Sequence, residues 1–223
     1  VIMSVPRSGS TWLGEVIRRC PGVCYRFQPN FAFSFPFSIS KYSSRNDINL
    51  FVKALQATKD PFTLGNLKAD GTIRSGIRNV NCKFQDTLVW KEVHNLDIAK
   101  LLLSEHNARI IGLIRSPLAV LSSWKNAPQE FNPTWDFNDE WLHAQKKNAE
   151  FKGSHFGLMK WIEVTHMFEE LEERFPNRFI KCSYSDLIAD PICEFTRIIE
   201  KIQLPFNEDV RKFIQLSRSS NSK

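Results

Sequence analysis

Long apolar runs, basic runs and an even set of cysteines are all missing from this sequence of 223 residues. No stretch reaches the roughly 18 apolar residues of a membrane-spanning helix, so we expect no membrane span in this segment. The 30 lysines and arginines are scattered along the chain, which makes a nucleic-acid surface the weaker interpretation. We therefore expect no nucleic-acid partner.

Five cysteines, an odd number, argue against a complete disulfide framework. Cys20 and Cys24 lie close together in the sequence, but no cluster of histidines or further cysteines accompanies them. We therefore expect no zinc site and no other metal. Cys82, Cys182 and Cys193 are interpreted as small buried apolar residues.

The net charge is +6 at pH 7 and the isoelectric point is near 9.1, a balance that suits an anionic ligand. The length fits one domain that can bury its own core, so we expect residues 1–223 to form a single domain. The sequence starts within an apolar run without a methionine. We expect it to be a fragment that begins in its first strand and lacks a C-terminal segment.

Apolar strands alternate with helical patterns, which predicts an α/β fold with a parallel β-sheet flanked by helices on both faces. Strands are expected at residues 1–5, 25–29, 87–93, 110–114 and 178–184. Helices are expected at residues 46–58, after a cap at Asn95 or Asp97, at residues 160–175, and from Asp190-Pro191 onward. Irregular segments are expected at residues 30–44, 59–83 and 127–157.

Residues 1–17 read VIMSVPRSGSTWLGEVI and carry the clearest functional signal. A buried strand is followed by a tight loop, residues 6–11, and then by apolar residues at helical spacing. This arrangement is typical of a phosphate site, because the free N–H groups and the positive end of the helix dipole face the anion. Arg7 adds a forked positive charge, and hydroxyl donors come from Ser8, Ser10 and Thr11.

The loop differs from the nucleotide-triphosphatase motif G-x-x-x-x-G-K-[ST]. Gly9 is its single glycine, and its cation, Arg7, precedes that glycine. A magnesium-dependent kinase also needs an acidic residue near the phosphates to hold the metal. The strand at 110–114 ends in Arg115 instead, which favours a donor that needs no metal over Mg·ATP.

The segment Pro6–Leu13 resembles the phosphosulfate-binding loop of sulfotransferases, P-[KR]-[ST]-G-[ST]-[ST]-x-L/W. These enzymes use 3′-phosphoadenosine 5′-phosphosulfate (PAPS) as their donor. A second stretch, ARIIGLIRSPLAVLSSW at 108–124, resembles the family's 3′-phosphate motif, in which an arginine ends a strand and a serine follows eight residues later. Arg115 and Ser123 occupy those positions. About two helical turns would bring the serine back toward the arginine.

A third stretch, Tyr184-Ser185-Asp186-Leu187 followed by Asp190-Pro191, resembles a further family pattern. The resemblance runs from Val1 to about Ile202 and implies a single sulfotransferase domain of P-loop-like architecture. The donor-binding residues that it implies are Arg7, Ser8, Gly9, Ser10, Thr11, Trp12, Arg115, Ser123 and Tyr184.

The resemblance also implies which residues contact each part of the donor. Arg7 is expected at the bridging oxygen of the leaving group, and Ser10 and Thr11 at the 5′-phosphate. Trp12 occupies the position where many members stack an aromatic ring on the adenine, although a core tryptophan explains it equally well.

The catalytic base is ambiguous in the sequence. In the protein-tyrosine and carbohydrate branches a glutamate on the second strand takes the acceptor's proton, but Gln28 stands there and cannot. In the cytosolic branch the base is a histidine after a lysine at the end of a strand, which here matches Lys91 and His94. We assign His94 as the base, with Glu92 as the reserve and as a partner that could orient the imidazole. Lys91 is expected at the transferring group and Gln28 beside the acceptor.

The sequence thus predicts transfer of a sulfuryl group from PAPS to a hydroxyl or amine on a carbohydrate or a small molecule. The alternatives are a P-loop nucleotide kinase and a catalytically impaired nucleotide-binding homologue, which Gln28 keeps open. The expected location is the cytoplasm, or the Golgi lumen if an N-terminal anchor was removed.

Overall fold

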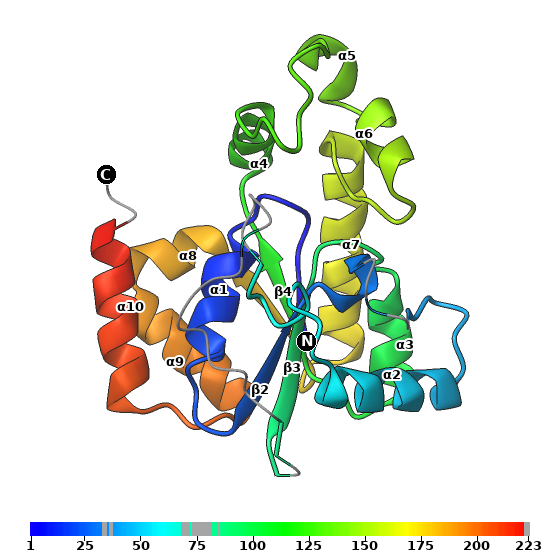
Figure 1. The fold of residues 1–223 in the computed structure, drawn as a ribbon. Helices are drawn as coiled ribbons and strands as arrows, with labels where there is room; N and C mark the ends of the chain where they lie inside the picture. Colours follow the sequence, from blue (N-terminus) through cyan, green and yellow to red (C-terminus); the bar gives the residue numbers. More distant parts are fainter. Residues whose placement is uncertain (33–34, 36–37, 68–71, 73–81, 84, 221–223) are drawn as a thin grey trace.

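A parallel β-sheet forms the centre of the computed structural model, which describes residues 1–32, 35, 38–67, 72, 82–83 and 85–220 (Figure 1). In these residues the sheet has five strands in the order β2-β3-β1-β4-β5, and every pair is parallel. The strands are β1 Ile2–Met3, β2 Val23–Phe27, β3 Thr87–Glu92, β4 Ile110–Ile114 and β5 Phe179–Ser183. The predicted α/β class is confirmed.

Helices cover both faces of this sheet (Figure 1). One face carries α1 Ser10–Ile17, α8 Tyr184–Ala189, α9 Pro191–Lys201 and α10 Glu208–Ser220. The other carries α2 Arg45–Ala57, α3 Ile98–Glu105 and α7 Leu158–Arg174. The central strand shows why both faces need cover: the adjacent residues Ile2 and Met3 are fully buried and belong to different core clusters. Successive strand side chains point to opposite faces, so an apolar run requires a helical layer on each side.

A third group of elements lies beyond the end of β4 (Figure 1). It comprises α4 Pro117–Lys125, α5 Phe137–Glu140 and α6 Gln145–Glu150. These elements have a small apolar core of their own, formed by Leu121, Trp124, Phe131, Ala144 and Phe156. The irregular segment predicted at residues 127–157 therefore contains two short helices that pack around aromatic rings.

The cysteine interpretation is partly wrong. Cys24 of β2 forms a disulfide with Cys82, and their Cα atoms lie 5.2 Å apart. Cys193 is exposed on α9, contrary to the prediction, whereas Cys182 is buried as predicted; Cys20 is also buried. An odd number of cysteines excludes complete pairing but still allows one disulfide. The two cysteines are 58 positions apart in the sequence, so no local pattern indicated that they pair.

Several element boundaries also differ from the prediction. The strand expected to reach residue 29 ends at Phe27, because Gln28 adopts a left-handed conformation with φ 41° and starts the short helix η1, Pro29–Phe31. Asp97 precedes α3, but its side chain makes no capping hydrogen bond. Asp190 does cap α9, accepting a hydrogen bond from the Cys193 N–H at 3.1 Å. Parts of the segments at 30–44 and 59–83 lie outside the described residues.

Candidate active site

The loop between β1 and α1 has a conformation that depends on glycine. Gly9 has φ 92°, and a Cβ atom there would collide with the ring of Tyr184. The Gly9 carbonyl accepts hydrogen bonds from the N–H groups of Trp12 and Leu13, which opens α1. Ser8 and Ser10 are buried beside it, and the Ser8 hydroxyl has no hydrogen-bond partner among the described residues. The loop is thus a small polar cradle at a helix N-terminus, as anion binding requires.

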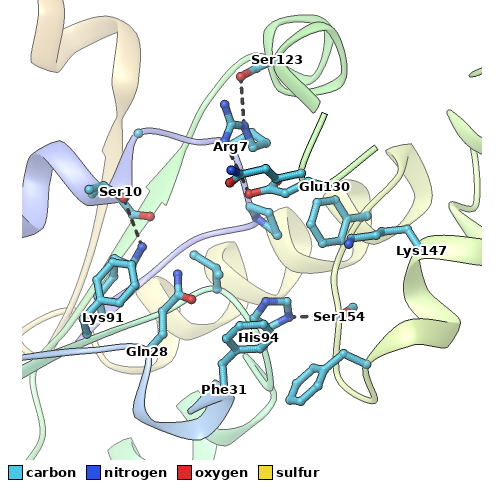
Figure 2. Close-up of a pocket in the computed structure, with 18 of the residues that line it drawn as sticks. Arg7, Ser10, Gln28, Phe31, Lys91, His94, Ser123, Glu130, Lys147 and Ser154 are labelled. Carbon is cyan, nitrogen blue, oxygen red and sulfur yellow. Dashed lines mark hydrogen bonds and ion pairs between the residues drawn. The ribbon is translucent and has the colours of Figure 1, made fainter. Parts of the chain in front are cut away.

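A pocket of about 840 Å³ lies next to this loop, where β1, β3 and β4 end (Figure 2). The predicted site residues that line it are Arg7, Gly9, Ser10, Thr11, Gln28, Lys91, His94, Arg115 and Ser123. Ser8, Trp12, Glu92 and Tyr184 are not part of its lining. The carboxyl ends of parallel strands are the usual place for a ligand in an open α/β sheet.

Two motifs that are distant in the sequence meet in this pocket. Arg115 Nη1 donates a hydrogen bond to the Arg7 carbonyl at 3.0 Å, and Arg7 Nε donates to Ser123 Oγ at 3.2 Å. The Arg115 guanidinium also lies 4.7 Å from the centre of the Tyr184 ring. The structure therefore brings both predicted phosphate motifs into one cationic cluster.

Lys91 is buried on β3 and projects into the pocket. Its Nζ donates to Thr11 Oγ1 at 3.3 Å and lies 4.3 Å from the centre of the Phe27 ring. Burial lowers the pKa of Lys91 to about 7, against the opposing influence of Glu92 and Glu130. A bound anion would raise this pKa again, so the charge of Lys91 depends on occupancy of the site.

His94 also lines the pocket and lies among phenyl rings. Its ring stacks on Phe31 with centroids 4.6 Å apart and meets Phe151 edge-on at 5.1 Å. His94 Nδ1 is 3.3 Å from Ser154 Oγ. Burial, reinforced by nearby His155, Lys91 and Lys147, lowers the pKa of His94 to about 3. The imidazole is therefore neutral at physiological pH, and while its pKa stays this low it is a weak proton acceptor.

Glu92 does not orient His94, and that part of the prediction is wrong. β3 ends at Glu92, so strand alternation does not extend to His94. The Glu92 carboxyl is fully buried and accepts a hydrogen bond from the Asn30 N–H at 3.1 Å. Burial raises the pKa of Glu92 to about 8.

Trp12 packs away from the pocket. Its indole Nε1 donates to Ser217 Oγ of α10 at 2.9 Å, and its ring meets Phe195 of α9 edge-on at 5.3 Å. These contacts tie the first turn of α1 to the last two helices.

Neither a metal cluster nor a membrane helix is evident in the part of the chain that the structure describes. No group of three or more metal-ligating side chains occurs there. No helix in it is long and apolar enough to cross a bilayer.

A family model described as "Sulfotransferase family" matches residues 1–208. The chain belongs to the sulfotransferase family. Its parallel sheet with helices on both faces is the P-loop-like architecture that the sequence resemblance implied. No curated protein matches this chain.

Solved structures of sulfotransferases share the fold. The crystal structure of mouse sulfotransferase SULT7A1 complexed with PAP has a TM-score of 0.56 and 14% identity, covering 97% of this chain and 62% of that one. The sulfotransferase from Alicyclobacillus acidocaldarius has a TM-score of 0.52 and 13% identity, covering 98% and 91%. The chain thus spans 62% of the length of the mouse protein.

Sequence reasoning missed the part of this pocket that comes from residues 127–157. The missed lining residues are Gln129, Glu130, Lys147, Glu150, Phe151, Ser154 and Phe156. Glu130 Oε1 lies 3.5 Å from Arg7 Nη1, and Lys147 Nζ lies 2.6 Å from Glu150 Oε2. The only available signal was the mixture of charged and aromatic residues in an otherwise unpatterned segment.

Proposed function

We propose that the chain transfers a sulfuryl group from PAPS to a hydroxyl or amine on a small molecule or carbohydrate. The observation that carries this proposal is the cluster in which Arg115 holds the Arg7 carbonyl and Arg7 reaches Ser123. The adjacent parallel strands β1 and β4 place these two motifs side by side, and in the family the two motifs bind opposite ends of the same donor. PAP in the crystal structure of mouse SULT7A1 supports the choice of donor.

The cradle fits the charge and shape of such a donor. The N–H groups at the start of α1 and the hydroxyls of Ser10 and Thr11 would hold the 5′-phosphate. Arg115 and Ser123 would hold the 3′-phosphate, and Tyr184 would support the Arg115 guanidinium from below. Ser8 lies buried beneath the cradle and Trp12 packs behind it, so both would act through the loop rather than by lining the pocket.

The transfer itself needs one new bond, one broken bond and one proton acceptor. The acceptor oxygen or nitrogen bonds to sulfur while the bond from sulfur to the bridging phosphate oxygen breaks. Arg7 would neutralise charge that develops on the bridging oxygen, and Lys91 would do so on the sulfuryl oxygens. His94 would take the acceptor's proton once the negative charge of the bound donor has raised its low pKa, and Gln28 would orient the acceptor.

Binding measurements separate this proposal from a P-loop kinase. We expect 3′-phosphoadenosine 5′-phosphate (PAP) to bind more tightly than AMP and more tightly than ATP·Mg, because Arg115 and Ser123 recognise the 3′-phosphate. A preference for ATP·Mg would instead support a P-loop kinase. A transfer assay with labelled PAPS over an acceptor panel then separates an active enzyme from an impaired homologue, which would bind PAP without turnover.

The disulfide indicates in which cellular compartment the protein resides. Bridges such as Cys24–Cys82 form and persist in oxidising compartments. We therefore favour the Golgi lumen over the cytoplasm. Mass spectrometry of the protein isolated from its native cells under alkylating conditions tests this, because a cytoplasmic protein would carry alkylated Cys24 and Cys82.

A further inference from the structure

His94, the proposed base, has a hydrogen-bond partner that no sequence motif accounts for. Ser154 Oγ lies 3.3 Å from His94 Nδ1, although the two residues are 60 positions apart in the sequence. Both side chains are buried, and both residues line the pocket. Figure 2 shows Ser154 on one side of the imidazole and Gln28 on the other. The hydrogen bond therefore engages Nδ1 on the side away from Gln28, which leaves Nε2 for the acceptor that Gln28 would orient.

The backbone that presents Ser154 is clamped against the backbone that presents His94. The N–H of Asn95, the residue after His94, donates to the Gly153 carbonyl at 2.8 Å. Both residues of this contact have a positive φ, 51° at Asn95 and 89° at Gly153, and a Cβ atom at position 153 would collide with the Asn95 side chain. This close approach therefore requires glycine. The chain neighbours of the hydrogen-bonded pair are thus joined directly to each other.

A second set of hydrogen bonds closes the loop that carries Ser154. Asn148 Oδ1 accepts from the Phe156 N–H at 3.0 Å, and Asn148 Nδ2 donates to the Phe156 carbonyl at 3.0 Å. Within the loop, the Ser154 N–H donates to the Phe151 carbonyl at 3.2 Å. The loop therefore has a defined shape that holds the hydroxyl against the His94 imidazole.

Aromatic rings pack on other sides of the His94 imidazole. The Phe31 ring stacks on it with an interplanar angle of 13°, the Phe151 ring meets it edge-on, and the Phe156 centroid lies 6.4 Å away. A phenyl ring carries no oxygen or nitrogen that could accept a hydrogen bond from an N–H group. Ser154 Oγ is thus the hydrogen-bond acceptor that the described residues provide at Nδ1.

Proton transfer to His94 creates a ring that needs such an oxygen. A neutral imidazole has one N–H group and one bare nitrogen, whereas a protonated imidazole has two N–H groups. If Nε2 takes the proton of the acceptor substrate, Nδ1 already carries its own, and a buried N–H group without a partner is unfavourable. His155, Lys91 and Lys147 also disfavour positive charge on this ring. A hydroxyl oxygen at Nδ1 would offset part of that cost.

We propose that Ser154 is a positioning residue that accepts a hydrogen bond from His94 Nδ1–H and thereby keeps Nε2 as the nitrogen that takes the proton of the acceptor substrate. One proton moves from the oxygen or nitrogen of the substrate to Nε2 and later leaves to solvent, while the proton on Nδ1 stays in place. Ser154 acts through the imidazole and takes no proton itself. This inference rests on the proposed function and adds to it a residue from the segment 127–157.

The tautomer of His94 tests the proposal in the wild-type protein. The ¹⁵N resonances of a protonated and a bare imidazole nitrogen are well separated, so NMR of the PAP-loaded protein with ¹⁵N-labelled histidines reports which nitrogen carries the proton. Comparison with His94→Ala assigns the signals of His94. We expect the proton on Nδ1 of the neutral ring. A proton on Nε2 would overturn the role of Ser154, because that nitrogen would then have no lone pair for the substrate's proton.

Substitution of Ser154 measures what the hydrogen bond contributes to turnover. Ser154→Ala should lower kcat at least about tenfold, the scale of a hydrogen bond to a charged group, with KM and PAP affinity little changed. It should also move the His94 proton toward Nε2, since a buried Nδ1–H would lack its partner. Ser154→Thr, which retains a hydroxyl, should restore most of kcat.

A matched control removes a serine hydroxyl outside the pocket. Ser104 Oγ donates to the Lys100 carbonyl at 2.8 Å within α3, and Ser104 is not part of the pocket lining. Ser104→Ala should keep both the wild-type kcat and the wild-type tautomer of His94. The control thus separates the loss of the contact with the imidazole from the general effect of replacing a serine.

The outcomes separate the two levels of the proposal. A bare Nδ1 in the wild-type protein, a near-normal kcat in Ser154→Ala, or a lowered kcat with an unchanged His94 tautomer overturns the role of Ser154 and leaves the proposed function in place. Failure of the wild-type protein to bind PAP overturns the proposed function, and the role of Ser154 with it.

Discussion

The pocket has two halves that are built in different ways. The strand-end half comprises residues 6–11 with Lys91 and Arg115, which the sheet positions directly: Ile2 of β1 pairs with Lys91 of β3 on one side and Ile111 of β4 on the other. The insertion half, residues 127–157, depends on side-chain packing around Trp124. Backbone pairing fixes the first half, so the second can change its lining without disturbing the first. On our proposal, the grip on the donor and the positioning of the base are therefore separable.

Removing the proposed base should have the largest effect. We expect His94→Ala to lower turnover by about 10²–10⁴-fold, the usual contribution of a general base, while PAP affinity barely changes. The measurement is kcat with PAPS and a responsive acceptor, beside calorimetry with PAP. Near-normal turnover would remove His94 from this role. Glu92→Gln, which tests the reserve assignment, would be the next variant to assay, although Glu92 is outside the pocket lining.

Arg115→Ala should mainly weaken PAP binding, in contrast to His94→Ala, which should mainly lower turnover. Loss of the contact with the 3′-phosphate should cost about 2 kcal/mol, or roughly 30-fold in PAP affinity, and leave the affinity for AMP little changed. Competition binding with the two nucleotides measures this difference. A variant in which both affinities fall alike would mean that Arg115 only supports the Arg7 carbonyl.

Lys91 predicts a pH dependence of donor binding. Its pKa is about 7 in the free protein, and the donor's negative charge should raise it, so binding takes up a proton above pH 7. We expect PAPS affinity to fall about tenfold between pH 7 and about 8.5. Lys91→Met should bind PAPS more weakly at pH 7 and should flatten the profile. A wild-type affinity that is flat with pH would mean that Lys91 is remote from the donor.

The lowered pKa of Lys91 also makes the free energy of unfolding depend on pH. Below its unfolded pKa of 10.5 Lys91 binds more protons in the unfolded chain than in the folded one, whose value is about 7. Its contribution to the free energy of unfolding therefore rises with pH between these two values. Urea unfolding of wild type and Lys91→Met across this range measures the contribution.

The smallest expected effect is that of a chelator. Because the proposed mechanism neutralises charge with arginine and lysine, sulfate transfer should continue in excess EDTA. Activity that EDTA abolishes and Mg²⁺ restores would contradict this and return a kinase-like site to consideration.

The contrast between the halves also explains what the sequence could predict. Residues 1–17 and 108–124 each hold a strand, a turn and a helix start in one short stretch, so the family resemblance of these two stretches implied that Arg7, Arg115 and Ser123 form one site. Glu130 and Ser154 reach the pocket only through packing around Trp124 and Phe156, which no local period reports. The left-handed backbone at Gln28 and the Cys24–Cys82 bridge were not predicted from the sequence for the same reason, since both depend on tertiary neighbours.

The contact between Trp12 and Ser217 joins residues 205 positions apart. Helix α1, which begins at the phosphate loop, is therefore hydrogen-bonded to α10, far from it in the sequence. During synthesis the loop emerges before α10, so it gains this support only when α10 follows. The cradle is thus translated well before the helix that completes its bracing.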